Sequence, residues 1–188
     1  MKTTQQLPST REDLIELVKK GSRLKYLYFW GHRKSPDNRI TQSCFSQWYH
    51  SPFTIDNISY PTAEHYMMAE KARLFKDSDT EARILAAKSP AEAKKLGRLV
   101  QNYNDEQWSN QRFHSVVQGN IAKFGQNPEL AAFLKGTNKR VLVEASPVDP
   151  VWGVGLAADD SKIDNPRYWK GLNLLGFALM EVRENLNK

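Results

Sequence analysis

The chain has 188 residues, of which 40% are hydrophobic and 26% charged, the composition of one globular domain and not of a disordered chain. Its formal net charge of +6 suits an anionic ligand, such as a phosphate ester or nucleic acid, or serves only solubility. No run of about 18 apolar residues exists and the first six residues lack a signal-peptide core, so we expect a cytoplasmic protein with no membrane partner. The single cysteine, Cys44, excludes an internal disulfide and a cysteine-based zinc site.

The N-terminal third predicts a helix followed by extended pieces. A capping-box pattern begins at Ser9, and apolar residues at helical spacing follow it, which favours a helix over 9–21. The aromatic, apolar segment 24–30 is typical of a strand, and 31–39 is a polar loop. Further extended segments are predicted at 44–49 and at 53–60, the latter with Asp56-Asn57 as its turn.

The middle of the chain predicts helices, because helix start and stop signals recur there. Pro61 stands at one helix entrance, Ser78 begins a second capping box, and Ser89-Pro90 supplies an N-cap with proline at N1. Gly125 follows the longest apolar stripe and is expected at the C′ position. The predicted helices span 62–75, 78–88, 90–97, 105–124 and 128–136.

The C-terminal part returns to extended structure before a last helix. The segment 140–145 is rich in valine and favours a strand, whereas 146–165 is too rich in Pro, Asp and Gly for regular structure. Loops of this length in a compact domain are often functional. Apolar spacing predicts a helix over 172–186. Helices interrupt the strands without a βαβ rhythm, so we predict a single-domain α+β fold, mostly helical with a small sheet.

The helix that begins after Pro61 carries the first candidate residues. Glu64 and Lys71 lie seven residues apart and share a helix face. On spacing alone, the favoured interpretation is structural, with Glu64 complementing the helix dipole and Lys71 solvated. His65 has no second histidine at i+4, so a buried core histidine is favoured over a metal ligand.

The irregular segment after the last strand carries a second group of candidates. Asp149 is followed by Trp152 and by two loop glycines, Gly153 and Gly155. Loop glycines let backbone N–H groups approach an anion, and tryptophan offers a flat face for a base or sugar. A plain turn at Asp149 with Trp152 as a core residue explains the pattern equally well. Other polar and aromatic candidates are Gln47, Trp48, Trp108 and Asn173, the last of which is otherwise a helix cap.

Several separated motifs, in this order, resemble the NADAR superfamily, also known as the YbiA-like family. They are Phe29-Trp30-Gly31-His32, Cys44-Phe45-Ser46-Gln47-Trp48-Tyr49, Tyr60-Pro61-Thr62-Ala63-Glu64-His65-Tyr66-Met67-Met68-Ala69-Glu70-Lys71-Ala72, Leu142-Val143-Glu144-Ala145-Ser146, Asp149 with Trp152-Gly153-Val154-Gly155, and Asn173-Leu174-Leu175-Gly176-Phe177-Ala178-Leu179-Met180. The resemblance covers residues 26–187 and implies a NADAR-like catalytic domain over 23–188. Residues 1–22 would then form an N-terminal extension, expected to be helical.

The resemblance implies cleavage of an N-glycosidic bond to a ribose that carries a 5′-phosphate. One implied substrate is a ribosylaminopyrimidine phosphate of riboflavin biosynthesis, and another is guanine modified with ADP-ribose, which would bring nucleic acid in as a partner. A non-catalytic nucleotide-binding module is the third alternative. Many relatives have Asn where this chain has Gln47, which keeps the amide but lengthens the side chain.

Carried over residue by residue, the resemblance assigns catalytic roles to Glu64 and Asp149, with Lys71 as a further candidate. Glu64 would face the sugar and Asp149 the base or the ribose hydroxyls, whereas Lys71 offers an alternative route through a Schiff base. Neither route needs a metal or a cofactor. Substrate-binding positions are expected at Trp108, Trp152, Gly153, Gln47, Trp48 and Asn173.

Overall fold

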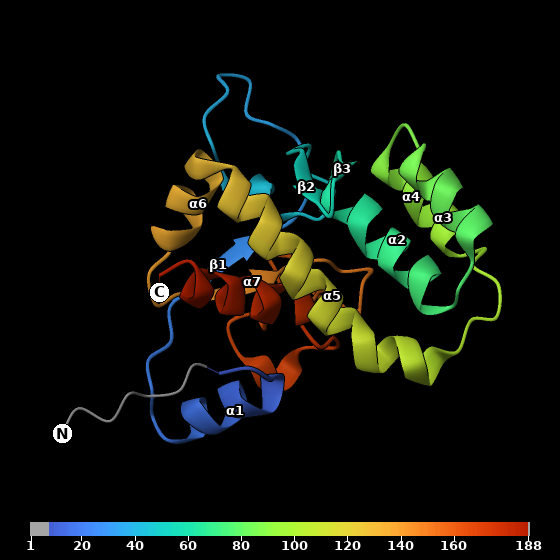
Figure 1. The fold of residues 1–188 in the computed structure, drawn as a ribbon. Coiled ribbons are helices and arrows are strands. Elements are labelled where there is room, and N and C mark those ends of the chain that lie inside the picture. Colours follow the sequence, from blue (N-terminus) through green and yellow to red (C-terminus); the bar gives the residue numbers. More distant parts are fainter. Residues whose placement is uncertain (1–7, 188) are drawn as a thin grey trace. The chain divides into compact units, whose positions relative to one another are not determined.

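The computed structural model describes residues 8–187 (Figure 1). Contacts divide them into two compact units. The terminal unit runs through Trp30 and continues over Thr137–Glu181, and the central unit comprises Gly31–Gly136 with the segment from Val182 onward. Seven α-helices and two two-stranded sheets occur among the described residues. The fold is therefore α+β and mostly helical, as the sequence predicted, although the strands form two small sheets.

The terminal unit is built on a parallel pair of strands, β1 (Tyr26–Phe29) and β4 (Val141–Glu144). Tyr26 is paired with Val141, and the first three residues of β4 are buried, as expected of a strand covered on both faces. Helix α1 (Arg11–Lys19) contacts the 3-10 helix η2 (Pro166–Tyr168). The segment 146–165, which connects β4 to η2, is irregular, as predicted.

The central unit begins with the hairpin of β2 (Phe53–Ile55) and β3 (Ile58–Tyr60). Asp56 and Asn57 have φ values of 50° and 64°, which a two-residue type I′ turn requires and which Asp and Asn tolerate. The predicted turn is therefore confirmed. The helices of this unit are α2 (Ala63–Leu74), α3 (Ser78–Leu85), α4 (Pro90–Gly97), α5 (Asp105–Gln126) and α6 (Pro128–Lys135).

Helix α2 lies at the core of the central unit, in contact with α3, α4 and α5 (Figure 1). Two glycines permit the close approach of its neighbours. A Cβ on Gly97 of α4 would lie 2.1 Å from the sulfur of Met68, and one on Gly119 of α5 would lie 2.5 Å from the ring of Tyr66. Because α2 is buried on most of its surface, its position is fixed from several sides.

Three local predictions need correction. The segment 44–49 is not a strand, because the 3-10 helix η1 (Gln42–Phe45) satisfies its backbone locally, with Cys44 N–H donating to Thr41 O. Helix α3 is capped by Asp77, not Ser78, since the Asp77 carboxylate accepts from the Thr80 N–H. Helix α5 continues through Gly125 to Gln126, and Asn127 is its C-cap because the residue before a proline disfavours helical backbone.

The last helix is α7 (Leu174–Asn185), of which the residues through Glu181 are assigned to the terminal unit and those from Val182 to the central unit. In the range 8–187, no helix is both long enough and apolar enough to cross a membrane. The expected N-terminal extension falls partly outside the described residues, because 1–7 are not among them. Within the remainder, Thr10 and Asp13 form the capping box of α1, one position later than the pattern beginning at Ser9 suggested.

Candidate functional site

Glu64 lies in the first turn of α2, one residue after the start of the helix. Thr62 is the N-cap, and its hydroxyl accepts from the His65 N–H. The Glu64 N–H, which has no acceptor inside the helix, donates to the backbone oxygen of Gln47 at 3.0 Å. The Glu64 residue is only 3% exposed. The structure therefore holds a buried carboxylate at the helix end where the dipole favours negative charge.

His65 is a core histidine, as predicted. Its Nδ1 lies 2.8 Å from the Thr62 hydroxyl and its Nε2 lies 3.1 Å from the backbone oxygen of Ala87. Since only a protonated Nε2 can donate to that carbonyl, Nδ1 accepts from Thr62. Burial lowers the pKa of His65, which favours this neutral form. Across the described part of the chain, no group of three or more His, Cys, Asp or Glu side chains is placed to hold a metal ion.

Lys71 lies two turns beyond Glu64, about 10 Å further along the helix axis at 1.5 Å per residue. Its ammonium donates to the backbone oxygen of Gly97 at 2.8 Å and lies 4.2 Å from the ring centre of Tyr103. The pKa of Lys71 is lowered, chiefly by burial and further by the charge of Arg98, against an opposing effect of Asp105. The expectation that Lys71 is simply solvated is therefore wrong.

Gln47 and Trp48 follow η1 in the segment that also contacts Glu64. The Gln47 side chain is 7% exposed, and its Oε1 accepts from Nδ2 of Asn120 on α5 at 2.8 Å. Its Nε2 is buried and has no hydrogen-bond partner among residues 8–187. The half-buried Trp48 ring lies 5.5 Å from the ring of His32 and 5.9 Å from the ammonium of Lys94. This segment therefore carries an unused donor and an accessible aromatic ring.

Trp108 lies in the first turns of α5, the helix that packs against α2. It is 7% exposed, so most of its indole is covered by protein. The side chain therefore contributes to the core of the central unit. Any stacking role would use the small part of the ring that remains exposed.

Asp149 closes a turn in the terminal unit. Its Oδ1 accepts from the N–H groups of Val151 and Trp152, at 2.9 and 2.8 Å. Gly153 follows in a position where a Cβ would lie 2.8 Å from the Cβ of Ser146 and 3.0 Å from the backbone oxygen of Glu144. Only glycine fits there without movement of the backbone. One carboxylate oxygen of Asp149 thus has the turn-forming role that the structural interpretation predicted. The Trp152 side chain is half-buried.

Asn173 joins the start of α7 to strand β4. Its Oδ1 accepts from the Glu144 N–H at 3.0 Å, and its Nδ2 donates to the backbone oxygen of Leu142 at 2.9 Å. Its φ of 56° is one that asparagine tolerates better than most residues. Asn173 is fully buried and its amide is engaged at both ends by β4. The structure therefore gives Asn173 a structural task, and its predicted substrate contact stays a prediction.

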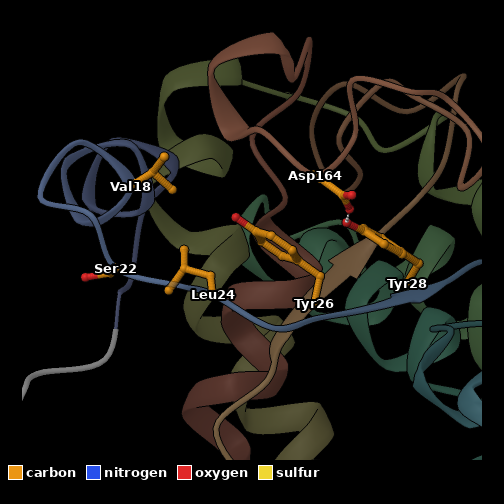
Figure 2. A pocket seen from close by; sticks show the side chains of 6 residues that line it. All are labelled: Val18, Ser22, Leu24, Tyr26, Tyr28 and Asp164. Atoms are coloured by element: carbon orange, nitrogen blue, oxygen red, sulfur yellow. Dashed lines mark hydrogen bonds between the residues drawn. The ribbon is translucent and has the colours of Figure 1, made fainter.

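A pocket of about 410 Å³ lies in the terminal unit and contains none of the predicted site residues (Figure 2). Its aromatic wall is formed by Tyr26 and Tyr28, which are two residues apart on β1 and therefore lie on the same face of the strand. Their rings stack with centres 6.0 Å apart. The Tyr28 hydroxyl donates to the Asp164 carboxylate. The remaining lining residues are Val18, Ser22 and Leu24.

The predicted site residues divide between the two units. The central unit holds Glu64, Gln47, Trp48, Lys71 and Trp108, and hydrogen bonding links the first two directly. The terminal unit contains the other predicted positions, which are Asp149, Trp152, Gly153 and Asn173. Within it, the Asn173 N–H donates to Gly153 O at 3.1 Å.

Sequence reasoning missed two buried polar residues on α5, Asn120 and Lys123. Asn120 holds the Gln47 amide, and Lys123 donates to the backbone oxygens of Cys44 and Ser46. The sequence could have indicated their burial, because Asn120 and Lys123 follow Val116 by four and seven residues and therefore lie on the apolar face of the helix. A polar residue at such a position requires a partner when it is buried.

Comparison with known proteins identifies the family. The NADAR domain model matches residues 28–187. The chain belongs to the NADAR domain family. N-glycosidase R617 of Acanthamoeba polyphaga mimivirus is 39% identical over 165 residues, covering 85% of this chain and 95% of the viral protein. N-glycosidase YbiA of Escherichia coli K12 is 33% identical over 144 residues, covering 77% of this chain and 79% of YbiA.

The NADAR fold is also found by structural comparison. The NMR structure of E. coli YbiA matches with a TM-score of 0.70 and 29% identity, over 88% of this chain and 87% of YbiA. The chloroplastic riboflavin biosynthesis protein PYRR of Zea mays is 34% identical over 143 residues, which are 70% of this chain and 20% of the maize protein. This NADAR chain thus belongs with hydrolases that act on N-glycosyl bonds.

Proposed function

We propose that this N-glycosidase hydrolyses the C1–N bond between a base and ribose 5-phosphate, with a ribosylaminopyrimidine phosphate of riboflavin biosynthesis as substrate. The similarity to a riboflavin biosynthesis protein supports this choice of base. The net charge of +6 suits a phosphorylated substrate. The observation that carries the proposal is the buried carboxylate of Glu64 in the first turn of α2.

Glu64 is the proposed reacting carboxylate. Departure of the base leaves positive charge at C1, and a carboxylate beside that carbon stabilises the charge. The departing base nitrogen takes up a proton from solvent. Water then bonds to C1 and gives a proton to Glu64, which returns it to solvent, so that one water is consumed in total. The products are ribose 5-phosphate and the free aminopyrimidine. Burial strengthens these electrostatic effects because little water screens them.

The remaining roles concern substrate binding. The buried Nε2 of Gln47 is a donor suited to a ribose hydroxyl, and binding there would give it the partner that a buried amide needs. For Asp149 we propose a contact with the base or a ribose hydroxyl through the oxygen that does not close the turn. Trp108 and Trp152 are proposed to stack on the base, a role that rests on the family resemblance.

A second route would use Lys71 as a nucleophile that forms a Schiff base with the opened ribose at C1. The lowered pKa of Lys71 favours the neutral amine that such a reaction needs. Against this route, its amine already donates to Gly97 O at the end of α4, and Lys71 lies two turns along the helix from Glu64. We therefore assign the reaction to Glu64 and water, with Lys71 as the alternative.

The experiment that tests the function offers the protein two substrates in separate reactions. One is the ribosylaminopyrimidine 5′-phosphate and the other is guanosine modified with ADP-ribose. We expect release of ribose 5-phosphate from the first, detected by mass spectrometry. Release of ADP-ribose from the second alone would replace the proposal with an ADP-ribosyl hydrolase. Binding of both without release from either would indicate a non-catalytic module.

A further inference from the structure

Lys123 of α5 is a buried charge without an acidic partner. It is 0% exposed, and no ion pair to it occurs within residues 8–187. Its ammonium lies 5.1 Å from the ring centre of Phe124 and 5.8 Å from that of Tyr49. An apolar side chain of similar volume is often as stable as a buried ion, or more so. A buried lysine in such surroundings therefore points to a task other than stability.

The hydrogen bonds of the Lys123 ammonium indicate what that task is. Its Nζ donates to Cys44 O at 2.7 Å and to Ser46 O at 2.9 Å. These carbonyls belong to the end of η1 and the turn that follows, where the backbone leaves helical geometry. A single side chain from α5 thus fixes both ends of a short irregular segment. Segments of this kind are otherwise the mobile parts of a fold.

The held segment continues directly into the contact with Glu64. The residue after Ser46 is Gln47, whose backbone oxygen accepts from the Glu64 N–H at 3.0 Å. One turn earlier on α5, Asn120 donates to Gln47 Oε1 at 2.8 Å and so orients the Gln47 side chain. Helix α5 therefore binds the backbone of the 44–47 segment through Lys123 and the Gln47 side chain through Asn120.

We propose that Lys123 is a positioning residue for the reaction, because its buried ammonium fixes the 44–47 segment and, through Gln47, the first turn of α2. The proposal rests on the proposed function, in which Glu64 is the reacting carboxylate. Displacement of a reacting group by about 1 Å can reduce turnover about 100-fold. In this role Lys123 acts by setting where the Glu64 carboxylate lies.

The test compares Lys123→Met with Gln126→Ala. Gln126 is a matched control, because it also lies on α5 and binds backbone, donating to Thr54 O at 2.7 Å and accepting from Thr54 N–H at 2.8 Å. We expect Lys123→Met to lower kcat about 10- to 100-fold with KM changed less than about threefold. Gln126→Ala should leave kcat within about twofold of the wild-type value. An equal fall in both variants, or an unchanged kcat in Lys123→Met, would overturn the proposal.

Amide hydrogen exchange supplies a readout that does not depend on activity. In Lys123→Met the Glu64 amide should exchange faster than in the wild type, whereas in Gln126→Ala it should not. Unchanged exchange at Glu64 would overturn the positioning role of Lys123, whether or not the wild type cleaves either substrate. Failure of the wild type to cleave either substrate would overturn only the proposed function. If Lys123→Met does not fold, Lys123→Gln is measured in its place, since it keeps a donor without a buried charge, and the same outcomes decide.

Discussion

The two ends of helix α2 carry charged side chains that share a helix face but meet different surroundings. Glu64 in the first turn is buried, and its N–H is held by Gln47 O. Lys71 near the last turn is half-buried, and its ammonium joins α2 to the end of α4 through Gly97 O. Spacing along one helix therefore does not make the two residues partners. What each can do depends on the segment that packs against its end of the helix.

The first and largest expected effect concerns Glu64. Replacement by Gln keeps the side-chain shape and the N–H bond to Gln47, and removes only the charge and the basic oxygen. We expect kcat to fall about 10²- to 10⁴-fold, the usual range for a group that transfers a proton. Steady-state turnover of the cleaved substrate measures this, with thermal unfolding as a control for folding. Near wild-type turnover would mean that the carboxylate does not react.

A second prediction concerns the pKa of the buried Lys123. Burial lowers the pKa of Lys123 to about 8, whereas an unfolded lysine titrates near 10.5. Between these values the unfolded chain binds the proton and the folded chain does not, so the free energy of unfolding rises with pH. We expect a rise of about 3 kcal/mol in the wild type relative to Lys123→Met across this window.

Urea unfolding at several pH values between 8 and 10.5 measures that rise. The nearby titratable groups are Cys44, whose pKa burial raises to about 12, and Tyr49, whose pKa is also raised by burial. Both also titrate in the variant, so the difference between the two proteins reports Lys123 together with its electrostatic effect on Cys44. A difference that stays flat with pH would show that the Lys123 ammonium is not desolvated.

The smallest expected effect is at the other end of α2. Lys71→Met removes the donor to Gly97 O and the ammonium that lies over the Tyr103 ring, and keeps an unbranched side chain of similar length. We expect kcat to stay within about threefold of wild type and stability to fall by about 1 kcal/mol, the value of one ordinary hydrogen bond. Turnover and urea unfolding measure the two quantities. A fall in kcat as deep as that of Glu64→Gln would move the chemistry to Lys71.

Local sequence signals predicted most of the fold. Pro61 and Ser89-Pro90 located α2 and α4, and Asp56-Asn57 located the hairpin, because caps and turns depend on a few adjacent residues. The segment 44–49 was predicted wrongly as extended. Its shape depends on Lys123, which lies 77 and 79 residues away along the chain, and no local pattern encodes that contact.

The candidate site was less predictable than the fold. Spacing alone favoured a structural role for Glu64, and only the ordered family motifs pointed to chemistry. Asn173 was expected to bind substrate, yet its amide is hydrogen-bonded to the backbone of Glu144 and Leu142 in β4. These two residues precede Asn173 by 29 and 31 positions, and no local pattern in the sequence shows that they lie beside it. Asn120 and Lys123 escaped notice because isolated polar residues on a long helix usually face solvent.

The most direct test of carboxylate-and-water chemistry at the first turn of α2 is borohydride reduction during turnover. A Schiff base between Lys71 and ribose would be reduced to a stable adduct, visible as added mass on the intact protein and located by peptide mapping. We predict that the wild-type protein releases ribose 5-phosphate and gains no mass. A ribosyl phosphate adduct on Lys71 would contradict the account and place the reaction at the opposite end of the helix.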